Sequence, residues 1–278
     1  GRKIMGFAVI LIVTIALIIF FCMDCAGKIN RQAEGTGVIY LAVPMLLTII
    51  LCVCSFRWKS EIDIFDSIDE YGYFWESKFK DILAFAGMCI LSILPAVLSV
   101  IGCVRLALHN GKTKEQQMFG SPDDDIHCLS VWSKTSTALG AVCTAAFSVF
   151  AAIAAVSAFS FAAVSSLKLI AATILIGCLT FGIGFIVMAV LFPMWVLIVG
   201  FHTIMSSLPM VLAAGVSGTA LIVFQVMSAV FMSAQVKKLV ENGSITKKKA
   251  ALYIFLSLLP VVSIVNAARI SKKLSVGA

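Results

Sequence analysis

Long apolar runs separated by short charged segments dominate the chain. Six such runs follow one another: Ile4–Cys22, Gly37–Phe56, Ile82–Val104, Ser136–Leu167, Leu169–Val236 and Ala250–Ala268. A helix needs about 20 apolar residues to cross a hydrocarbon core roughly 30 Å thick. Because lipid offers no hydrogen bonds to the backbone, unbroken runs of this length predict helices. The pattern therefore predicts an all-α polytopic integral membrane protein.

The lengths of the runs predict six to eight membrane-embedded helical segments in a single transmembrane domain, residues 1–278. The fifth run has 68 residues and is long enough for two or three spans. Its predicted break is Ser206–Pro209, where a Ser cap and an early Pro favour a new helix. Gly182 and Gly184 mark a weaker second break.

Two similar segments surround Pro95 and Pro260. Residues 91–97 and 256–262 are identical at five of seven positions, and basic residues flank both segments at both ends. Two interpretations follow. Each segment is either a re-entrant hairpin turned by its Pro, or an ordinary span with a kink.

Charge is almost absent from the centre of the chain and concentrated at the ends of the runs. Thr135–Val236 carries one formal charge, Lys168, in 102 residues. The net charge of +7 therefore fits lipid headgroups and the positive-inside rule and predicts no nucleic-acid partner. With both Pro segments as hairpins and the fifth run as three spans, a cytoplasmic N-terminus leaves only Lys28, Arg31 and Lys168 outside. We expect the N-terminus in the cytoplasm.

Two polar segments interrupt the runs. Residues 57–81 predict an acidic amphipathic helix at the membrane interface, which offers a docking surface for a basic partner. Its docking candidates are Asp63, Asp66, Asp69, Glu70 and Trp75. The polar loop 109–134 contains Asp, His and Cys residues, but Ser121 and Pro122 followed by acids are typical of a helix start. The sequence therefore predicts no metal site there.

A face of small residues recurs every four positions in the fourth run. It consists of Gly140, Thr144, Ser148 and Ala152. Small residues on one face allow another helix to approach closely in a membrane. The face predicts packing within the chain or contact with another chain or a second copy, in addition to the lipid bilayer.

Few residues are candidates for chemistry. Cys22 and Cys25 form a C-x-x-C pair at the end of the first run, a pattern that redox centres use. Gln225 and His202 are polar positions in the longest run. Gln225 either lines a pathway or hydrogen-bonds a neighbouring helix, and His202 is either an interfacial residue or a proton carrier. With Pro95 and Pro260 they are the ligand or pathway candidates. No H-E-x-x-H or nucleotide-binding loop occurs, and the pattern indicates no cofactor.

Three functions fit this pattern. The leading hypothesis is a non-enzymatic membrane subunit, permease-like or an assembly component, that acts with a partner. The first alternative is a self-contained transporter or channel for a neutral or apolar solute, since prolines that interrupt helices build transport sites. The second alternative is a membrane thiol oxidoreductase that uses Cys22 and Cys25.

Overall fold

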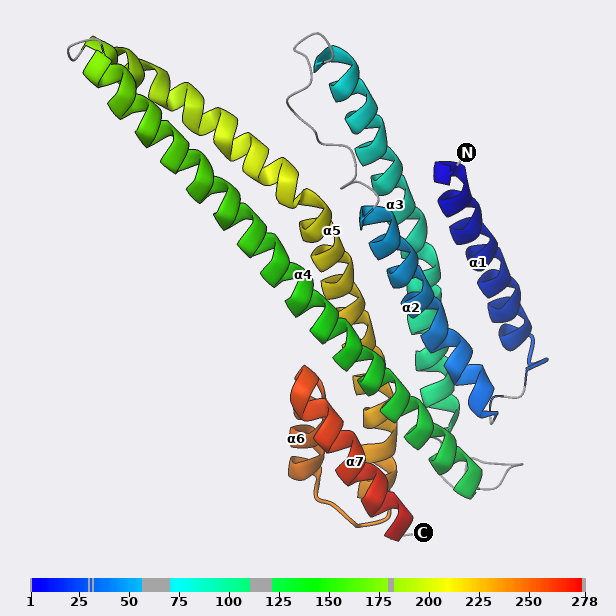
Figure 1. Ribbon diagram of the computed structural model, residues 1–278. Helices are drawn as coiled ribbons and strands as arrows, with labels where there is room; N and C mark the ends of the chain where they lie inside the picture. The colour runs from blue at the N-terminus through cyan, green and yellow to red at the C-terminus, as the bar shows by residue number, and fades with distance from the viewer. Residues whose placement is uncertain are drawn as a thin grey trace. The chain divides into compact units, whose positions relative to one another are not determined.

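The computed structural model describes residues 2–29, 31, 33–56, 71–110, 122–179 and 183–276. Apart from short turns, these residues form helices (Figure 1). In chain order they are α1 (Arg2–Cys25), α2 (Glu34–Phe56), α3 (Tyr71–Asn110), α4 (Pro122–Leu179), α5 (Ile183–Glu241), α6 (Lys247–Ser257) and α7 (Pro260–Val276). Five of these helices are long and apolar enough to cross a membrane, which indicates a multi-pass membrane protein.

The chain divides into two compact units. The first unit contains Gly1–Cys54, Ser67–Ala146 and Val216–Ala278, and the second contains Ser55–Asp66 and Phe147–Gly215. The second unit exposes large apolar side chains on both of its helices, such as Phe159 and Leu197. The prediction of a single domain over residues 1–278 stays a prediction.

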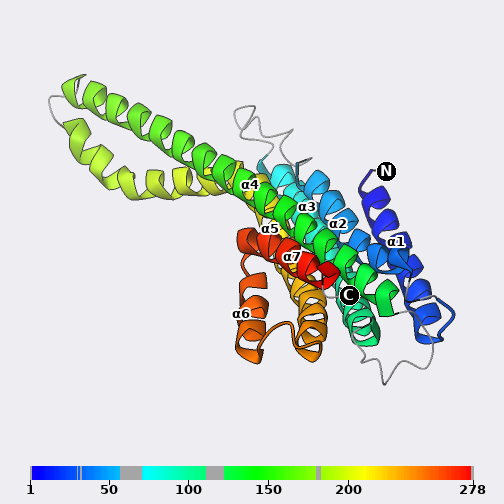
Figure 2. The ribbon, with the colours of Figure 1, turned by 90° about the horizontal axis from the view of Figure 1, so that it is seen from below.

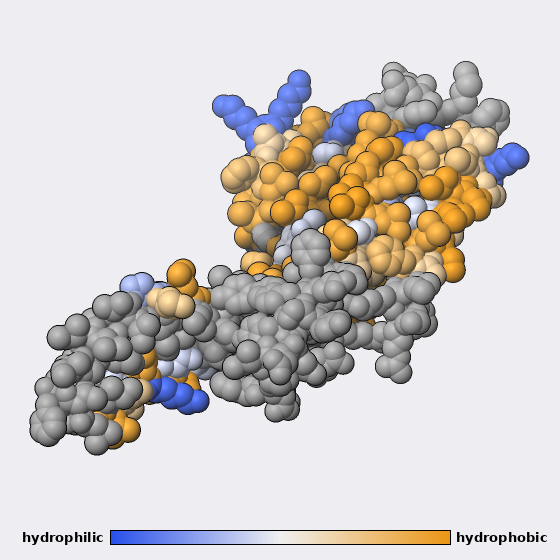
Figure 3. Space-filling model, turned by 90° about the horizontal axis from the view of Figure 1, so that it is seen from above, coloured by the Kyte–Doolittle hydropathy of each residue, from blue (hydrophilic) through white to orange (hydrophobic). Residues whose placement is uncertain are grey.

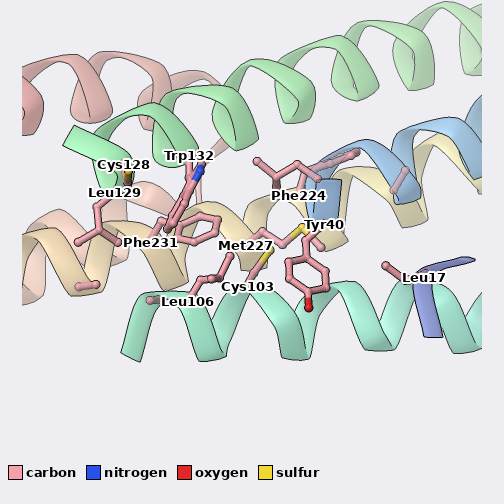
Figure 4. Packing of buried hydrophobic residues seen from close by; sticks show 14 of the residues in the cluster. Leu17, Tyr40, Cys103, Leu106, Cys128, Leu129, Trp132, Phe224, Met227 and Phe231 are labelled. Atoms are coloured by element: carbon pink, nitrogen blue, oxygen red, sulfur yellow. The ribbon is translucent and has the colours of Figure 1, made fainter. Parts of the chain in front are cut away.

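Aromatic side chains fill the core of the first unit, as Figure 4 shows. Trp132 and Phe231 pack with ring centroids 5.6 Å apart and join α4 to α5. Two glycines make room for this core. A Cβ on Gly37 would lie 2.4 Å from the Trp132 ring, and one on Gly102 would lie 2.4 Å from the Tyr40 ring. These positions therefore require glycine because its absent side chain lets the rings reach the neighbouring backbone.

Helix α1 buries only one narrow stripe. Ile10, Thr14 and Leu17 are buried at the spacing of one helix face, and α1 packs against α3. The opposite face exposes large apolar side chains, for example Ile12 at 65% and Ile19 at 56%. Figure 3 shows one face of the molecule, on which most of the coloured surface is hydrophobic. A helix that is apolar on its exposed side is typical of one that faces lipid.

Five helix ends meet on one side of the first unit. An ion pair between Asp24 and Arg105 joins the C-terminal ends of α1 and α3. Trp132 Nε1 donates a hydrogen bond to the Glu34 carbonyl 2.7 Å away and so joins the start of α4 to the start of α2. Trp132, Thr137 and Gly140 of α4 face Phe231, Ser228 and Gln225 of α5 in turn, so these two helices run antiparallel. We call this side, where α1, α3 and α5 end and α2 and α4 begin, the Asp24 side.

Several predicted breaks are wrong. Helix α3 continues through Pro95, so of the two interpretations of this segment the hairpin is wrong and the uninterrupted helix holds. Helix α4 continues through Lys168, and α5 continues through Ser206–Pro209, so neither position is a break. The weaker predicted break lies close to the observed one, since α4 ends at Leu179 and α5 begins at Ile183. The physical reason is that a Pro removes one backbone hydrogen bond, and packed membrane helices tolerate that loss.

A helical hairpin does form at Pro260. Helix α6 ends at Ser257, α7 begins at Pro260, and the two helices pack against each other (Figures 1 and 2). The Asn266 amide donates to the Tyr253 carbonyl 2.7 Å away. Pro suits the first position of a helix because that residue needs no backbone N–H bond. With 11 residues, α6 is about 16 Å long, too short to cross the hydrocarbon core alone.

Candidate functional site

A stripe of polar residues runs along α5 inside the first unit. Ser217, Gln225, Ser228 and Gln235 are 0%, 6%, 0% and 1% exposed. At about 100° per residue they fall within roughly 80° of the helix circumference, and so share one face. Over this stretch α5 rises about 27 Å, close to the roughly 30 Å of a hydrocarbon core. The stripe is therefore long enough to follow most of a membrane crossing.

Helix α4 contributes the facing residues. Thr137 bonds Ser228, and a Cβ on Gly140 would lie 3.2 Å from the Gln225 amide nitrogen. Gly140 thus leaves space for the Gln225 side chain. We call this surface the α4–α5 seam. It consists of Ser133, Thr137 and Gly140 on α4 and of the polar stripe on α5, Ser217, Gln225, Ser228 and Gln235. At its far end, the Ser217 hydroxyl lies 3.7 Å from the Cys52 sulfur of α2.

Hydroxyl and amide groups in the seam differ in their hydrogen bonding. Thr137 donates to the Ser133 carbonyl 2.7 Å away, as Ser and Thr side chains can do within a helix. The two amides do not have this option. Both polar atoms of Gln225 and of Gln235 lack a hydrogen-bond partner among the residues that the structure describes, as does the Ser133 hydroxyl. A buried unpaired polar group costs about 1–3 kcal/mol, so a hydrogen bond to either amide would be favourable.

A second polar site lies at the edge of the first span. The carboxylate of Asp24 is fully buried, and its Oδ1 lies 2.6 Å from Arg31 Nε. Its Oδ2 lies 3.6 Å from Arg105 Nε and accepts a hydrogen bond from the Tyr40 hydroxyl at 3.2 Å. Arg31 also donates to the Asp24 carbonyl oxygen. We call Asp24, Arg31, Tyr40 and Arg105 the Asp24 cluster.

The Asp24 cluster carries more positive than negative charge. Two guanidinium groups face one carboxylate, and the Arg31 and Arg105 side chains are 23% and 35% exposed. Arg105 Nη1 donates to the Cys25 sulfur at 2.8 Å, and its guanidinium lies 5.7 Å from the Phe21 ring centroid. The cluster therefore ties α1, α2 and α3 together and presents a surplus charge near the surface.

The sequence identified one of these sites in part. Gln225 was a candidate because a polar residue in a long apolar run is conspicuous. Gln235 was missed because it lies next to the charged end of the same run. Asp24, Arg31 and Arg105 come from separate segments, and only their positions beside apolar runs could have indicated them.

The other predicted site residues lie apart. Cys22 and Cys25 are exposed and not joined by a disulfide. Pro95 is buried within α3. Pro260 begins α7, and His202 lies in α5, but their side chains fall outside the described residues.

The predicted partner surfaces are described only in part. Asp63, Asp66, Asp69 and Glu70 fall outside the described residues, and of Trp75 only the helical backbone is described. On the small-residue face, Gly140 packs against Gln225 of the same chain, Thr144 is half-buried, and Ser148 and Ala152 are exposed. The prediction of a partner on this face stays a prediction.

Fold and sites together indicate a helical multi-pass membrane protein with a buried polar seam. No protein-family model, no curated protein and no solved structure matches the chain. A functional proposal therefore rests on the chemistry of the two sites.

Proposed function

We propose that the chain is a permease-like membrane protein that lets small uncharged molecules cross along the α4–α5 seam. The observation that supports this proposal is a pair of buried amides on one face of α5, Gln225 and Gln235, that have no hydrogen-bond partner in the described part of the chain. Each amide offers two N–H donors and a carbonyl acceptor. A hydroxyl, a neutral amide or water can pair with both kinds of group as it passes.

The burial of these amides favours a solute over other partners. Gln225 is 6% exposed and Gln235 is 1% exposed, so neither a lipid tail nor a second chain at the surface reaches them directly. Since no described residue pairs with these amides, a small molecule that enters between the helices would supply the hydrogen bonds. Two amides, 10 positions apart on α5 and about 15 Å along its axis, would serve as successive stations.

The chemistry of the seam limits the solute to uncharged molecules. Its seven residues are Ser, Thr, Gly and Gln, and none of them is ionisable. An ion in a membrane interior without an opposing charge is costly. Coupling to protons or sodium through a carboxylate has no residue to act on in this seam. We therefore expect passive movement of the solute down its gradient, with ions excluded.

The test uses proteoliposomes that contain the full chain. Swelling in glycerol or urea gradients is followed by light scattering, with empty vesicles as the blank. We expect solute entry well above the blank, and Gln225→Leu reduces it strongly because the amide is lost. The matched control is Ile222→Leu, which changes a 65% exposed position on the outer face of α5 and leaves the rate unchanged. Equal rates for wild type, Gln225→Leu and empty vesicles would refute the proposal.

We also infer an orientation from the charges on the two ends of the first unit. Of the 17 Lys and Arg residues that the structure describes, 12 belong to the Asp24 side and four, Arg2, Lys3, Lys78 and Lys80, belong to the side of the N-terminus. The 12 are Lys28, Arg31, Arg105, Lys134, Lys237, Lys238, Lys247, Lys248, Lys249, Arg269, Lys272 and Lys273. The positive-inside rule then favours an Asp24 side in the cytoplasm and an N-terminus outside, opposite to the sequence-based expectation.

The α6–α7 hairpin fits a re-entrant element that enters the membrane from the Asp24 side. Its turn exposes apolar side chains, with Phe255 at 64%, Leu258 at 50% and Leu259 at 44%. Its base begins with three lysines, residues 247–249, and packs on the end of α5. Basic residues at the base and apolar residues at the tip suit headgroups and hydrocarbon respectively.

The two remaining functions stay predictions. A partner-dependent subunit would co-purify with another chain in mild detergent, whereas a permease that works alone would not need one. Thiol redox chemistry would require reactive Cys22 and Cys25, and Cys25→Ser would abolish it.

A further inference from the structure

The geometry of the Asp24 cluster points to a binding site for the phosphate of an anionic membrane lipid, and we propose that Arg31 and Arg105 hold this headgroup. The inference does not rest on the permease proposal, because the cluster lies at a helix end and not in the α4–α5 seam.

The first argument is the balance of charge. Arginine stays protonated under all relevant conditions, so two guanidinium groups around one carboxylate leave one positive charge. Arg31 uses Nε and Nη2 on Asp24, and Arg105 uses Nε on Asp24 and Nη1 on Cys25. None of these contacts uses Arg31 Nη1 or Arg105 Nη2, and the two side chains are 23% and 35% exposed. A phosphate oxygen would accept from both.

The second argument is preorganisation. Because the two guanidinium groups bind the two oxygens of the same carboxylate, they are held close together before any ligand arrives. The Tyr40 hydroxyl and the complete burial of Asp24 fix the carboxylate in turn. Arginine forks match phosphate geometry, and charge-assisted hydrogen bonds are about twice as strong as neutral ones. A preorganised pair loses little side-chain entropy on binding.

The third argument is depth. Cys25 and Asn110 end the apolar stretches of α1 and α3, so the cluster lies where lipid headgroups begin. Phosphate is the most abundant anion at that depth. An anionic lipid fits better than a zwitterionic one, since the latter brings a cation of its own to a site that already has a surplus positive charge. Lys28 on the same loop is exposed and adds to the attraction.

The test compares the full chain in vesicles of phosphatidylcholine with and without phosphatidylglycerol. We expect phosphatidylglycerol to raise the unfolding midpoint of the wild type, because a ligand that binds only the folded state stabilises it. Arg105→Gln should bind this lipid about tenfold more weakly, since one charge-assisted contact is lost. The control is Lys237→Gln, which removes a 57% exposed basic side chain on the same side and should preserve the shift.

A second measurement covers the case in which Arg105→Gln does not fold. Native mass spectrometry of the wild type, released from mixed-lipid vesicles, should show phosphatidylglycerol retained in preference to phosphatidylcholine, and Arg105→Lys should retain less. Absence of any phosphatidylglycerol effect on the wild type overturns the proposal and leaves the cluster as a helix staple. If Arg105→Gln and Lys237→Gln lose the phosphatidylglycerol effect equally, general surface charge attracts the lipid, and the proposed site is wrong. An equal shift with inorganic phosphate would assign the site to a free anion and overturn the lipid assignment.

Discussion

Replacing Gln225 with Leu separates the stability of the seam from its proposed function. In the wild type both amide atoms of this side chain are buried and pair with none of the residues that the structure describes, and each such group costs about 1–3 kcal/mol. Leu has a similar volume and fills the space beside Gly140 without polar atoms. Removing the amide should therefore raise the free energy of unfolding, or leave it unchanged, while solute entry falls. At roughly 2–4 °C per kcal/mol, the unfolding midpoint rises by a few degrees.

Thr137→Val is the matched control, because we expect it to change the free energy of unfolding in the opposite direction. Thr137 bonds Ser228 and the Ser133 carbonyl, so Val removes satisfied hydrogen bonds at the same seam. We expect a loss of about 0.5–1.5 kcal/mol. The assay is thermal unfolding of both variants in one detergent, followed by solute entry in vesicles. If Gln225→Leu destabilises the protein by as much as Thr137→Val does, the amide is paired in the native state and the reasoning fails.

Three further predictions concern the rest of the first unit. Asp24→Asn should lower the free energy of unfolding by about 2–3 kcal/mol. This is less than the roughly 3–5 kcal/mol lost with a wholly buried ion pair, because the two arginines reach solvent. An unchanged unfolding midpoint would show that the ion pairs do not contribute to stability. Gly37→Ala should destabilise the folded protein by about 1–3 kcal/mol, because the added methyl group clashes with the Trp132 ring. Gly35→Ala is the control in the same thermal assay, since no atom lies within 4 Å of the methyl group it adds, and we expect no change there. If the Asp24 side is cytoplasmic, a maleimide that cannot cross the membrane should leave Cys22 unlabelled in intact cells and label it after permeabilisation. Labelling of Cys22 in intact cells would show the opposite orientation.

The apolar runs predicted the first two helices well. The runs Ile4–Cys22 and Gly37–Phe56 became α1, Arg2–Cys25, and α2, Glu34–Phe56, because lipid leaves the backbone no alternative to a helix. Hydropathy contains no information about where one helix stops within a continuous apolar stretch. The single charge of Lys168 was therefore a poor boundary, since a helix of this length can carry one long basic side chain.

The two proline segments show why local likeness is a weak guide. Residues 91–97 and 256–262 are nearly the same, yet Pro95 lies inside α3 whereas Pro260 starts α7. The difference lies in the surroundings. Pro95 is buried within the first unit, where packing holds the helix on both sides of it. At the second segment a turn at Leu258 and Leu259 allows α6 and α7 to pack on each other.

The Asp24 cluster could not be predicted because its members meet only after folding. Positions 24, 31, 40 and 105 belong to α1, the following loop, α2 and α3. In the sequence, Asp24 is notable only for standing between Cys22 and Cys25. A buried carboxylate needs cationic partners, but nothing local indicates which of the 21 basic residues supplies them. Gln225 was easier to find, since its polarity is visible within its own helix.

The two sites also differ in how firmly they join their helices, and this bears on how the seam would open. The ends of α1, α2 and α3 are tied by ion pairs to a buried carboxylate, and breaking such a pair costs about 3–5 kcal/mol when fully buried. At the seam, α4 and α5 meet through the Thr137–Ser228 hydroxyl bond and apolar contacts such as Trp132 on Phe231. A neutral bond contributes about 1 kcal/mol. The apolar contacts contribute more, about 1.5–3 kcal/mol for each fully buried side chain, so Trp132 and Phe231 also hold the two helices firmly. We therefore expect the Asp24 cluster and this aromatic contact to stay closed, and a solute to enter on the Gln225 side of the Thr137–Ser228 bond.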